Sequence, residues 1–253
     1  MKKTNVLGLE YVNSTKEETV DFVFELVEKK ELVTVFTPNA EIAYNAYKDE
    51  SFRKIISSAS LLIPDGSGVV LASKIVNSPL VEKIAGVDFG IEIIKKCSEK
   101  GMSLFIVGGK PGVAQTATEK LCDSFPKLFI AGACDGYFEK NGPENDRVID
   151  MINESGADVL FVCLGSPAQE KWVYENSNRI KSAKIICCLG GSVDVYAGNV
   201  KRAPRFFIKM NLEWLYRLIK EPKRLPRMMC LPKYIGRAFM LRKTNGKITN
   251  KEV

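Results

Sequence analysis

The chain has 253 residues, among them 37 Lys and Arg, 30 Asp and Glu, seven Cys and no His. The absence of His excludes an imidazole base, a Ser–His or Cys–His nucleophile pair and a His-ligated metal. The net charge of +7 is unevenly distributed: residues 199–253 carry 15 basic and three acidic side chains, a net of +12, whereas residues 1–198 carry a net of −5. We therefore predict an acidic body, residues 1–198, followed by a basic appendage, residues 199–253.

The cysteines and the N-terminus are typical of a protein in a reducing compartment that carries no signal peptide. The seven Cys are an odd number without a CxxC spacing, and most lie in apolar segments, which is typical of buried free thiols in a reducing compartment. The N-terminus is basic, but no long apolar run follows it. No window reaches the roughly 18 consecutive apolar residues of a spanning helix. We expect a cytoplasmic protein, or one that sits on a membrane from the cytoplasmic side.

The first 198 residues alternate short apolar runs with amphipathic segments. The runs that predict strands are Leu32–Phe36, Leu61–Ile63, Ser103–Val107, Lys127–Ala131, Asp158–Leu164 and Lys184–Leu189. Several are apolar on both faces, as the buried strands of a parallel sheet are. Helices are expected between them, one after a Thr15–Glu18 capping box, one near Pro111 and one at Pro143. This alternation predicts an α/β fold, a Rossmann-like parallel sheet with helices on both faces.

The appendage is predicted to be helical. Residues 206–220 are amphipathic and are expected to form one helix that stops at Pro222, after which Pro226 and Pro232 break the chain into short helical pieces. Basic and large apolar side chains are interleaved in it. This mixture suits an anionic membrane surface, phosphate recognition or nucleic acid. A solvated basic helix fits poorly, because too many apolar side chains would be exposed.

Ligands of open α/β sheets bind beyond the carboxyl ends of the strands, where this chain carries unusual residues. Asp65 follows a buried strand, so its carboxylate could act as a base, or it could cap a helix that begins near Gly66. Asn39 could likewise cap its own helix. The turn Gly108-Gly109 could bring backbone N–H groups to a phosphate, or it could be a plain tight turn, since GxGxxG and P-loop spacings are absent.

Taken together, these strand-end motifs resemble the WecG/TagA/CpsF glycosyltransferase family. The matching segments lie in the family's order and cover nearly the whole chain: TPNAE at 37–41, PDGSGVV at 64–70, FIVGGKPGVA at 105–114, LGSPAQEKW at 164–172, GGSVDVYAGNVKRAP at 190–204 and LEWLYRLIKEPKRLPR at 212–227. Each segment alone is unspecific, but the combination is highly specific.

The resemblance implies an inverting hexosyltransferase. Such an enzyme moves N-acetylmannosamine from UDP-N-acetylmannosamine onto N-acetylglucosamine carried by undecaprenyl diphosphate, through a β-1,4 linkage, in wall teichoic acid synthesis. Direct displacement needs one base and stabilisation of the departing UDP. The resemblance implies no metal and no other cofactor. It also implies a peripheral place on the inner face of the cell membrane, with an anionic surface as partner and no nucleic acid; an exposed apolar appendage could drive homo-oligomerisation in solution.

The resemblance also assigns roles to residues. Asp65 matches the base, and Thr37 and Asn39 match active-site positions beside it. Three arginines match appendage side chains that close over the leaving diphosphate, where they would supply the positive charge that a metal ion otherwise gives. They are Arg217, Arg224 and Arg227. We expect the site to be complete only when the appendage is folded against the body.

Further residues are predicted to bind substrate. Gln169 matches a polar position that would hold sugar hydroxyls or phosphate. The predicted nucleotide contacts are Gly108, Gly109, Tyr137 and Asp194. Lys83 stands where the family more usually has Arg, and it keeps the charge but not the bidentate geometry.

Other functions stay open. The motifs do not separate N-acetylmannosamine from N-acetylmannosaminuronic acid or a hexose as the sugar that is moved, nor teichoic acid from a capsule or exopolysaccharide. An NAD(P)-dependent protein is a second class, against which the missing GxGxxG speaks. A nucleic-acid-binding α/β protein is a third, which the aromatic and Met content of the appendage disfavours.

Overall fold

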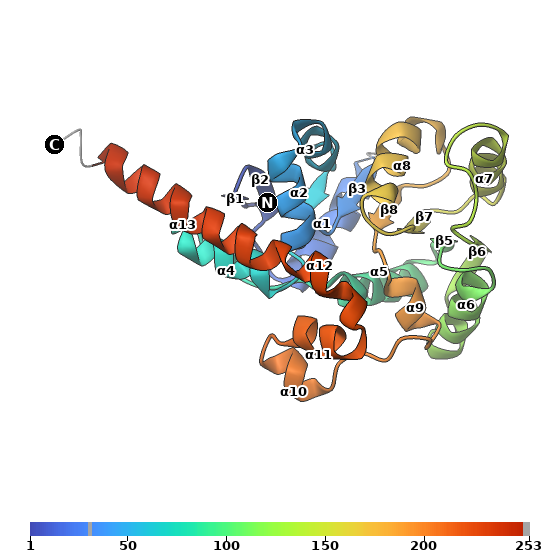
Figure 1. Cartoon of the computed structure of the whole chain (residues 1–253). Helices are drawn as coiled ribbons and strands as arrows, with labels where there is room; N and C mark the ends of the chain where they lie inside the picture. Colours follow the sequence, from blue (N-terminus) through green and yellow to red (C-terminus); the bar gives the residue numbers. More distant parts are fainter. Residues whose placement is uncertain (30–31, 250–253) are drawn as a thin grey trace.

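A computed structural model describes residues 1–29 and 32–249. Within them, the side chains of Arg205, Lys209, Arg217, Arg224 and residues 243–249 are not described. At the centre lies an eight-stranded sheet in the order β1-β2-β4-β3-β8-β7-β5-β6 (Figure 1). Its strands are β1 Lys3–Val6, β2 Leu9–Val12, β3 Val33–Phe36, β4 Leu61–Leu62, β5 Ser103–Gly108, β6 Phe129–Cys134, β7 Val159–Cys163 and β8 Ile185–Cys188.

All neighbouring strands except β1 and β2 run parallel, so the predicted parallel sheet is confirmed. β1 and β2 form an antiparallel hairpin that the sequence pattern did not predict. Its turn has Leu7 and Gly8 at φ of 53° and 88°, which is the geometry of a tight hairpin turn. Leucine is a poor signal for such a turn, because a left-handed backbone disfavours a branched side chain. The Asn5 carboxamide oxygen holds the turn by accepting a hydrogen bond from the Gly8 amide, at 3.0 Å.

Helices cover both faces of the sheet, as predicted. Successive strand residues point to opposite faces, so each face packs against its helices in a separate hydrophobic core. In β3, for example, Val35 points into one core and Phe36 into the other. One face carries α2 Ala40–Lys48, α3 Glu50–Ser57, α4 Ser67–Ile75, α7 Pro143–Glu154 and α8 Ala168–Asn176. The other face carries α1 Lys16–Glu28, α5 Gly86–Lys100, α6 Val113–Ser124 and α9 Ser192–Tyr196. The capping box predicted at Thr15 is present at the start of α1, and all seven cysteines are free thiols, as expected.

The appendage corrects two expectations. The single helix predicted over residues 206–220 is wrong: α10 Arg205–Lys209 and α11 Glu213–Lys220 are separate helices, because Asn211 takes a left-handed backbone with φ of 58°. The break predicted at Pro232 is also wrong. Pro232 lies in the first turn of α13 Cys230–Thr249, where no intrahelical N–H donor is needed. The short pieces η2 Pro222–Arg224 and α12 Leu225–Met228 connect α11 to α13.

The helix α13 joins the appendage to the body. It lies along α2 and α4 and extends beyond them (Figure 1). Its side chains Tyr234 and Ala238 are fully buried in the same core as residues of α2, α3 and α4. The division of the chain at residue 198 stays a prediction, but part of the basic segment contributes to the core of the acidic one.

Candidate active site

A pocket of about 640 Å³ lies beyond the carboxyl ends of the parallel strands. The segments that follow β3, β4, β5, β6, β7 and β8 all contribute to its wall, together with residues of the appendage. This is the edge of the sheet where ligands of open α/β folds bind, and the volume lies in the range of small-molecule sites. The strand-end residues that the sequence singled out are therefore brought to one cavity.

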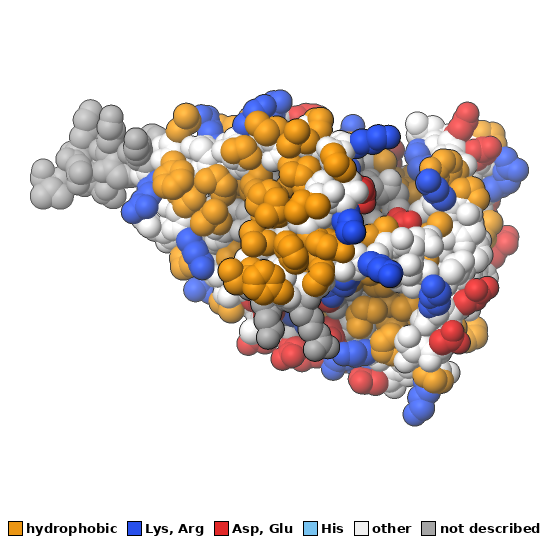
Figure 2. Space-filling model, turned by 60° about the horizontal axis from the view of Figure 1, so that its bottom comes forward, with side chains coloured by type: hydrophobic (Ala, Val, Ile, Leu, Met, Phe, Trp, Pro, Cys, Tyr) orange, Lys and Arg blue, Asp and Glu red, His pale blue; other side chains and the backbone are white. Residues whose placement is uncertain are grey.

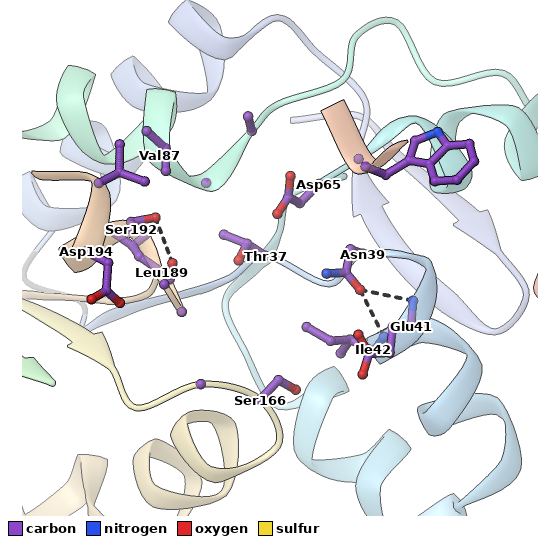
Figure 3. Close-up of a pocket in the computed structure, with 18 of the residues that line it drawn as sticks. Thr37, Asn39, Glu41, Ile42, Asp65, Val87, Ser166, Leu189, Ser192 and Asp194 are labelled. Carbon is purple, nitrogen blue, oxygen red and sulfur yellow. Dashed lines mark hydrogen bonds between the residues drawn. The ribbon is translucent and has the colours of Figure 1, made fainter. Parts of the chain in front are cut away.

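Asp65 lies in this pocket close to the segment after β3 (Figure 3). The interpretation of Asp65 as a helix cap is wrong: α4 has Gly66 at its N-cap position, and no side chain caps it. The positive φ of Gly66, 84°, turns the chain between Asp65 and the helix. The Asp65 carboxylate therefore stands in the pocket wall without capping α4.

Thr37 and Asn39 each use part of their hydrogen-bonding capacity to build the wall. The Thr37 hydroxyl donates to the Cys188 carbonyl at 3.0 Å, which ties β3 to β8 and leaves the Thr37 oxygen as an acceptor. The Asn39 side-chain oxygen accepts from the Glu41 and Ile42 amides at 3.0 and 3.1 Å, so the capping interpretation of Asn39 is confirmed. Its Nδ2 amide is the end that faces Thr37 in Figure 3.

Gln169 lines the pocket from the first turn of α8, although it is almost fully buried. Its side-chain oxygen accepts a hydrogen bond from the Gly190 amide at 2.9 Å, which connects α8 to the turn before α9. Its Nε2 donates to the neighbouring Glu170 carboxylate at 2.8 Å.

The Gly108-Gly109 turn favours the tight-turn interpretation. The Gly109 amide donates to the Cys163 carbonyl at 3.3 Å, so it is occupied within the sheet. A Cβ at Gly108, where φ is 139°, would lie 2.3 Å from the Cys163 carbonyl oxygen. Glycine is therefore required by the close approach of β5 and β7. Gly109 lines the pocket, whereas Gly108 is not among the lining residues.

Three more predicted residues line the pocket: Lys83, Tyr137 and Asp194. Tyr137 is largely exposed and follows β6. Asp194 is in the first turn of α9, beside Ser192, across the pocket from Asp65 (Figure 3). Their roles as nucleotide contacts stay predictions.

Four helices begin at the pocket without a side-chain cap. They are α4, α5, α8 and α9, and their first turns contribute Ser67, Gly86, Gln169 and Ser192 to its wall. The first amides of a helix lack intrahelical acceptors and carry a partial positive charge. The Gln169 and Ser192 amides already donate to the Gly165 and Leu189 carbonyls, so the starts of α4 and α5 are the ones that favour an anionic ligand.

The appendage closes one side of the pocket. Arg227, just before α13, pairs its Nε with the Glu41 carboxylate of α2 at 2.9 Å. The Ser67 hydroxyl donates to the Asn211 carbonyl at 3.2 Å. Leu231 packs on Gly68, where a Cβ would lie only 2.5 Å from the leucine Cδ1. The predicted Arg217 and Arg224 belong to α11 and η2, but their side chains lie outside the described part of the structure.

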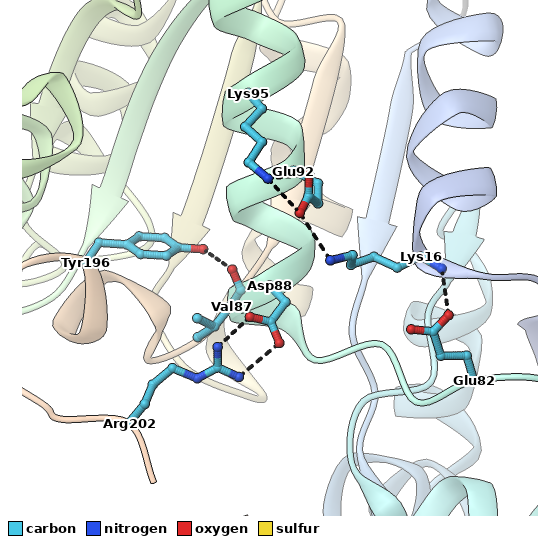
Figure 4. A network of polar contacts seen from close by, with 8 residues as sticks. All are labelled: Lys16, Glu82, Val87, Asp88, Glu92, Lys95, Tyr196 and Arg202. Atoms are coloured by element: carbon cyan, nitrogen blue, oxygen red, sulfur yellow. Dashed lines mark hydrogen bonds and ion pairs between the residues drawn. The ribbon is translucent and has the colours of Figure 1, made fainter. Parts of the chain in front are cut away.

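Arg202 is a pocket residue that sequence reasoning missed. It precedes the appendage helices and forms a bidentate ion pair with Asp88 in the first turn of α5, with Nη2 and Oδ2 2.9 Å apart (Figure 4). The Tyr196 hydroxyl donates to the Val87 carbonyl at 3.0 Å in the same region. Together these contacts fix the beginning of α5, which forms a pocket wall. The only signal in the sequence was its place in the segment GNVKRAP.

Two further observations on the described residues concern metal binding and membrane spanning. No three Cys, Asp or Glu side chains within residues 1–29 and 32–249 gather as a cation site would require. In the same ranges, no helix combines the length and the apolar character needed to cross a bilayer.

Comparisons with known proteins show which family the sequence matches. The model of the family described as "Glycosyl transferase WecG/TagA/CpsF family" matches residues 4–248. A Bacillus subtilis (strain 168) protein named N-acetylglucosaminyldiphosphoundecaprenol N-acetyl-beta-D-mannosaminyltransferase is 36% identical over 235 residues, covering 92% of this chain and 90% of the relative. Proteins of the same name from Bacillus spizizenii and Staphylococcus aureus (strain MRSA252) are 35% and 30% identical, covering 98% and 97% of this chain and 95% and 94% of the relatives.

Proposed function

The chain belongs to the WecG/TagA/CpsF family of glycosyltransferases, and on that premise we propose that its pocket transfers N-acetylmannosamine from UDP-N-acetylmannosamine to N-acetylglucosamine on undecaprenyl diphosphate. The relatives' name supports this lipid-linked acceptor and the β configuration of the product. A β product from an α-linked nucleotide sugar requires inversion in a single displacement. The proposed place of the reaction is the synthesis of the teichoic acid linkage unit in the cell wall.

The observation that carries the mechanism is Asp65, a pocket carboxylate without a capping role in a chain that has no His. In the proposed reaction, this carboxylate takes the proton of the acceptor hydroxyl as the hydroxyl oxygen bonds to C1 of the donor sugar. The bond between C1 and the UDP oxygen breaks, and UDP leaves with the electron pair. The Thr37 oxygen and the Asn39 Nδ2 amide flank this reaction as acceptor and donor.

The departing diphosphate needs positive charge, which we assign to the chain's own groups rather than to a metal ion. The uncapped first turns of α4 and α5 supply backbone N–H groups, whereas the Gln169 and Ser192 amides of α8 and α9 already donate to the Gly165 and Leu189 carbonyls. Arg227 stands at the pocket in its ion pair with Glu41. We propose the same role for Arg217 and Arg224. This dependence on arginines gives the appendage a catalytic purpose, since a body without it would lose them.

The base is tested with a matched pair of acid-to-amide variants. Asp65→Asn is expected to lower transfer to a soluble lipid-linked N-acetylglucosamine acceptor by at least 100-fold, with the UDP dissociation constant unchanged in calorimetry. Asp194→Asn, the control on the opposite wall, is expected to weaken donor binding instead. Transfer by Asp65→Asn within a few-fold of the unmodified protein would rule out Asp65 as the base.

The donor is tested on the unmodified protein with a panel of nucleotide sugars. UDP-N-acetylmannosamine is expected to give the highest kcat/KM. A higher value with UDP-N-acetylmannosaminuronic acid or a UDP-hexose would keep the reaction class and replace the sugar. Addition of a chelator is expected to leave the rate unchanged, and strong inhibition would overturn the assignment of the diphosphate to arginines and helix N-termini alone.

We also propose that the appendage rests on the inner face of the membrane, where a lipid-linked acceptor lies. Figure 2 shows hydrophobic side chains gathered on the face that the C-terminal helices form, with Lys and Arg around its edge. The exposed large apolar side chains of these helices and their connections are Phe206, Met210, Ile219, Leu225, Met229, Phe239 and Met240. Apolar side chains bordered by basic ones are typical of helices that lie in an anionic interface.

Membrane binding is tested by flotation with vesicles that contain anionic phospholipid, against vesicles of phosphatidylcholine alone. Phe206→Ser is expected to reduce binding to the anionic vesicles several-fold. Phe129→Ser is the control, because Phe129 is as exposed as Phe206, 62% against 66%, but lies on the edge strand β6. Equal flotation of both variants and the unmodified protein would exclude this face as the membrane surface.

A further inference from the structure

Glu170 is a buried carboxyl group directly behind the pocket. It is only 1% exposed and lies in the first turn of α8. Its Oε1 accepts the hydrogen bond from Gln169, whereas its Oε2 is buried without a hydrogen-bond partner among the described residues. Burial raises the pKa of this carboxyl above its usual value. A buried carboxyl with one unpartnered oxygen destabilises the folded state, and a glutamate that only filled space would be replaceable by an apolar side chain.

The partner of Glu170 explains why an acceptor is needed there. The Gln169 amide can take two orientations related by a flip, which exchange its oxygen and its nitrogen. In the structure, the Gln169 Oε1 accepts from the Gly190 amide at 2.9 Å and its Nε2 donates to Glu170 at 2.8 Å. The flipped orientation would set two donors against each other at Gly190 and two acceptors at Glu170. Glu170 and Gly190 therefore select one orientation together.

The selected orientation leaves a defined group for a ligand. An amide nitrogen carries two hydrogens, and the bond to Glu170 uses one of them. The second N–H of Gln169 remains available at a side chain that lines the pocket. Its natural partner is an oxygen atom of the bound substrate, either of a phosphate or of a sugar hydroxyl.

We propose that Glu170 is a positioning residue, which holds the Gln169 amide so that its second Nε2–H is presented to an oxygen of the substrate. The proposal rests on the proposed function, because it names a group that acts within the same site. Glu170 itself does not touch the substrate. It also secures the Gly190-Gly191 turn, since Gln169 in the flipped orientation could not accept from Gly190.

A double-mutant cycle separates positioning from a structural role. Glu170→Met removes the acceptor at similar length and is expected to lower kcat/KM by about 10- to 100-fold, the effect of losing one hydrogen bond to the substrate. Gln169→Met is expected to have an effect of the same size. The double variant is expected to be no worse than Gln169→Met alone, because Glu170 acts through Gln169. A full additive loss, or activity of Glu170→Met equal to that of the unmodified protein, would overturn the proposal.

An exchange of the two side chains controls for folding. In the double variant Gln169→Glu and Glu170→Gln, a carboxylate at 169 can still accept from Gly190 and from the new amide at 170. The internal hydrogen bonds are thus kept, but the N–H donor to the substrate is lost. The expected result is a thermal midpoint within a few degrees of the unmodified protein together with a loss of at least 10-fold in kcat/KM. Retained activity in this variant would refute the donor role.

The single variant Glu170→Gln is the conservative rescue. Its side-chain oxygen can accept from Gln169, so it is expected to recover most of the activity that Glu170→Met loses. Affinity for UDP alone distinguishes the two sources of the substrate oxygen: a contact to phosphate weakens UDP binding in Glu170→Met, and a contact to the sugar affects only the complete donor. The Gln169 side-chain amide resonances report its orientation without any substrate, and unchanged resonances in Glu170→Met would overturn the proposal even if the donor sugar were misassigned.

Discussion

Truncation of Tyr234 tests whether α13 is part of the core of the body. Tyr234 is fully buried on a helix that packs against α2 and α4. Removal of a buried aromatic side chain costs about 3–5 kcal/mol, because the transfer free energy is lost and a cavity remains. We therefore expect Tyr234→Ala to lower the free energy of unfolding by that amount.

The same free energy is lost from the packing of α13 against the body. Since about 1.4 kcal/mol corresponds to a factor of ten in an equilibrium constant, a loss of about 3–5 kcal/mol raises the undocked population by roughly 100-fold to several thousand-fold. Urea unfolding measures the total loss, and hydrogen exchange of the α13 amides measures local opening.

The matched control is Phe239→Ala on the same helix. Phe239 is 50% exposed, so its truncation is expected to change the free energy of unfolding by less than about 0.5 kcal/mol. If Tyr234→Ala and Phe239→Ala unfolded at the same urea concentration, α13 would not share the core, and the closed pocket wall derived from its packing would be wrong.

Three further outcomes are expected. Gly68→Ala should destabilise the protein by about 1–3 kcal/mol in urea, because its Cβ would overlap the Leu231 side chain, whereas Gly236→Ala, in open space on α13, should stabilise it by about 0.5–1 kcal/mol; equal effects would contradict the packing. Arg202→Lys should lose the bidentate pair with Asp88. Because the pair is partly exposed, the free energy of unfolding should fall by less than about 1 kcal/mol, and the difference should shrink in high salt. Burial raises the pKa of Glu170 above its usual 4.5, so the neutral carboxyl stabilises the folded state below pH 4.5, and this contribution is lost as the pH rises through the folded-state pKa. The midpoint temperature of thermal unfolding should therefore fall more steeply over this pH range in the unmodified protein than in Glu170→Gln.

The parallel sheet and its ligand-binding edge could be predicted because their signals are local. Apolar runs such as Ser103–Val107 mark buried strands, and every parallel strand delivers its carboxyl end to the same edge. Asp65 and Gln169 could therefore be expected in one crevice before any contact was known. The starts of α1 and α7 were predictable for the same reason, from a capping box and a proline.

The remaining features depend on contacts between distant segments. Arg227 meets Glu41 across 186 residues, and Arg202 meets Asp88 across 114, so no periodicity connects them. The break at Asn211 depends on one left-handed residue inside an otherwise amphipathic run. The sequence is compatible with Asp65 either as a cap of α4 or as a pocket residue. The structure decides between them, because Gly66 occupies the N-cap position and Asp65 lines the pocket.

Gly68 and Leu231, which meet in the pocket wall, are 163 positions apart in the chain. A ribosome that adds about 5–20 residues per second delivers Leu231 roughly 10–30 s after Gly68. During this interval the apolar face that α2 and α4 offer to α13 has no cover. The nascent chain is therefore exposed to association through that face until α13 emerges. Completion of the pocket and protection from aggregation are thus the same late event in the synthesis of this protein.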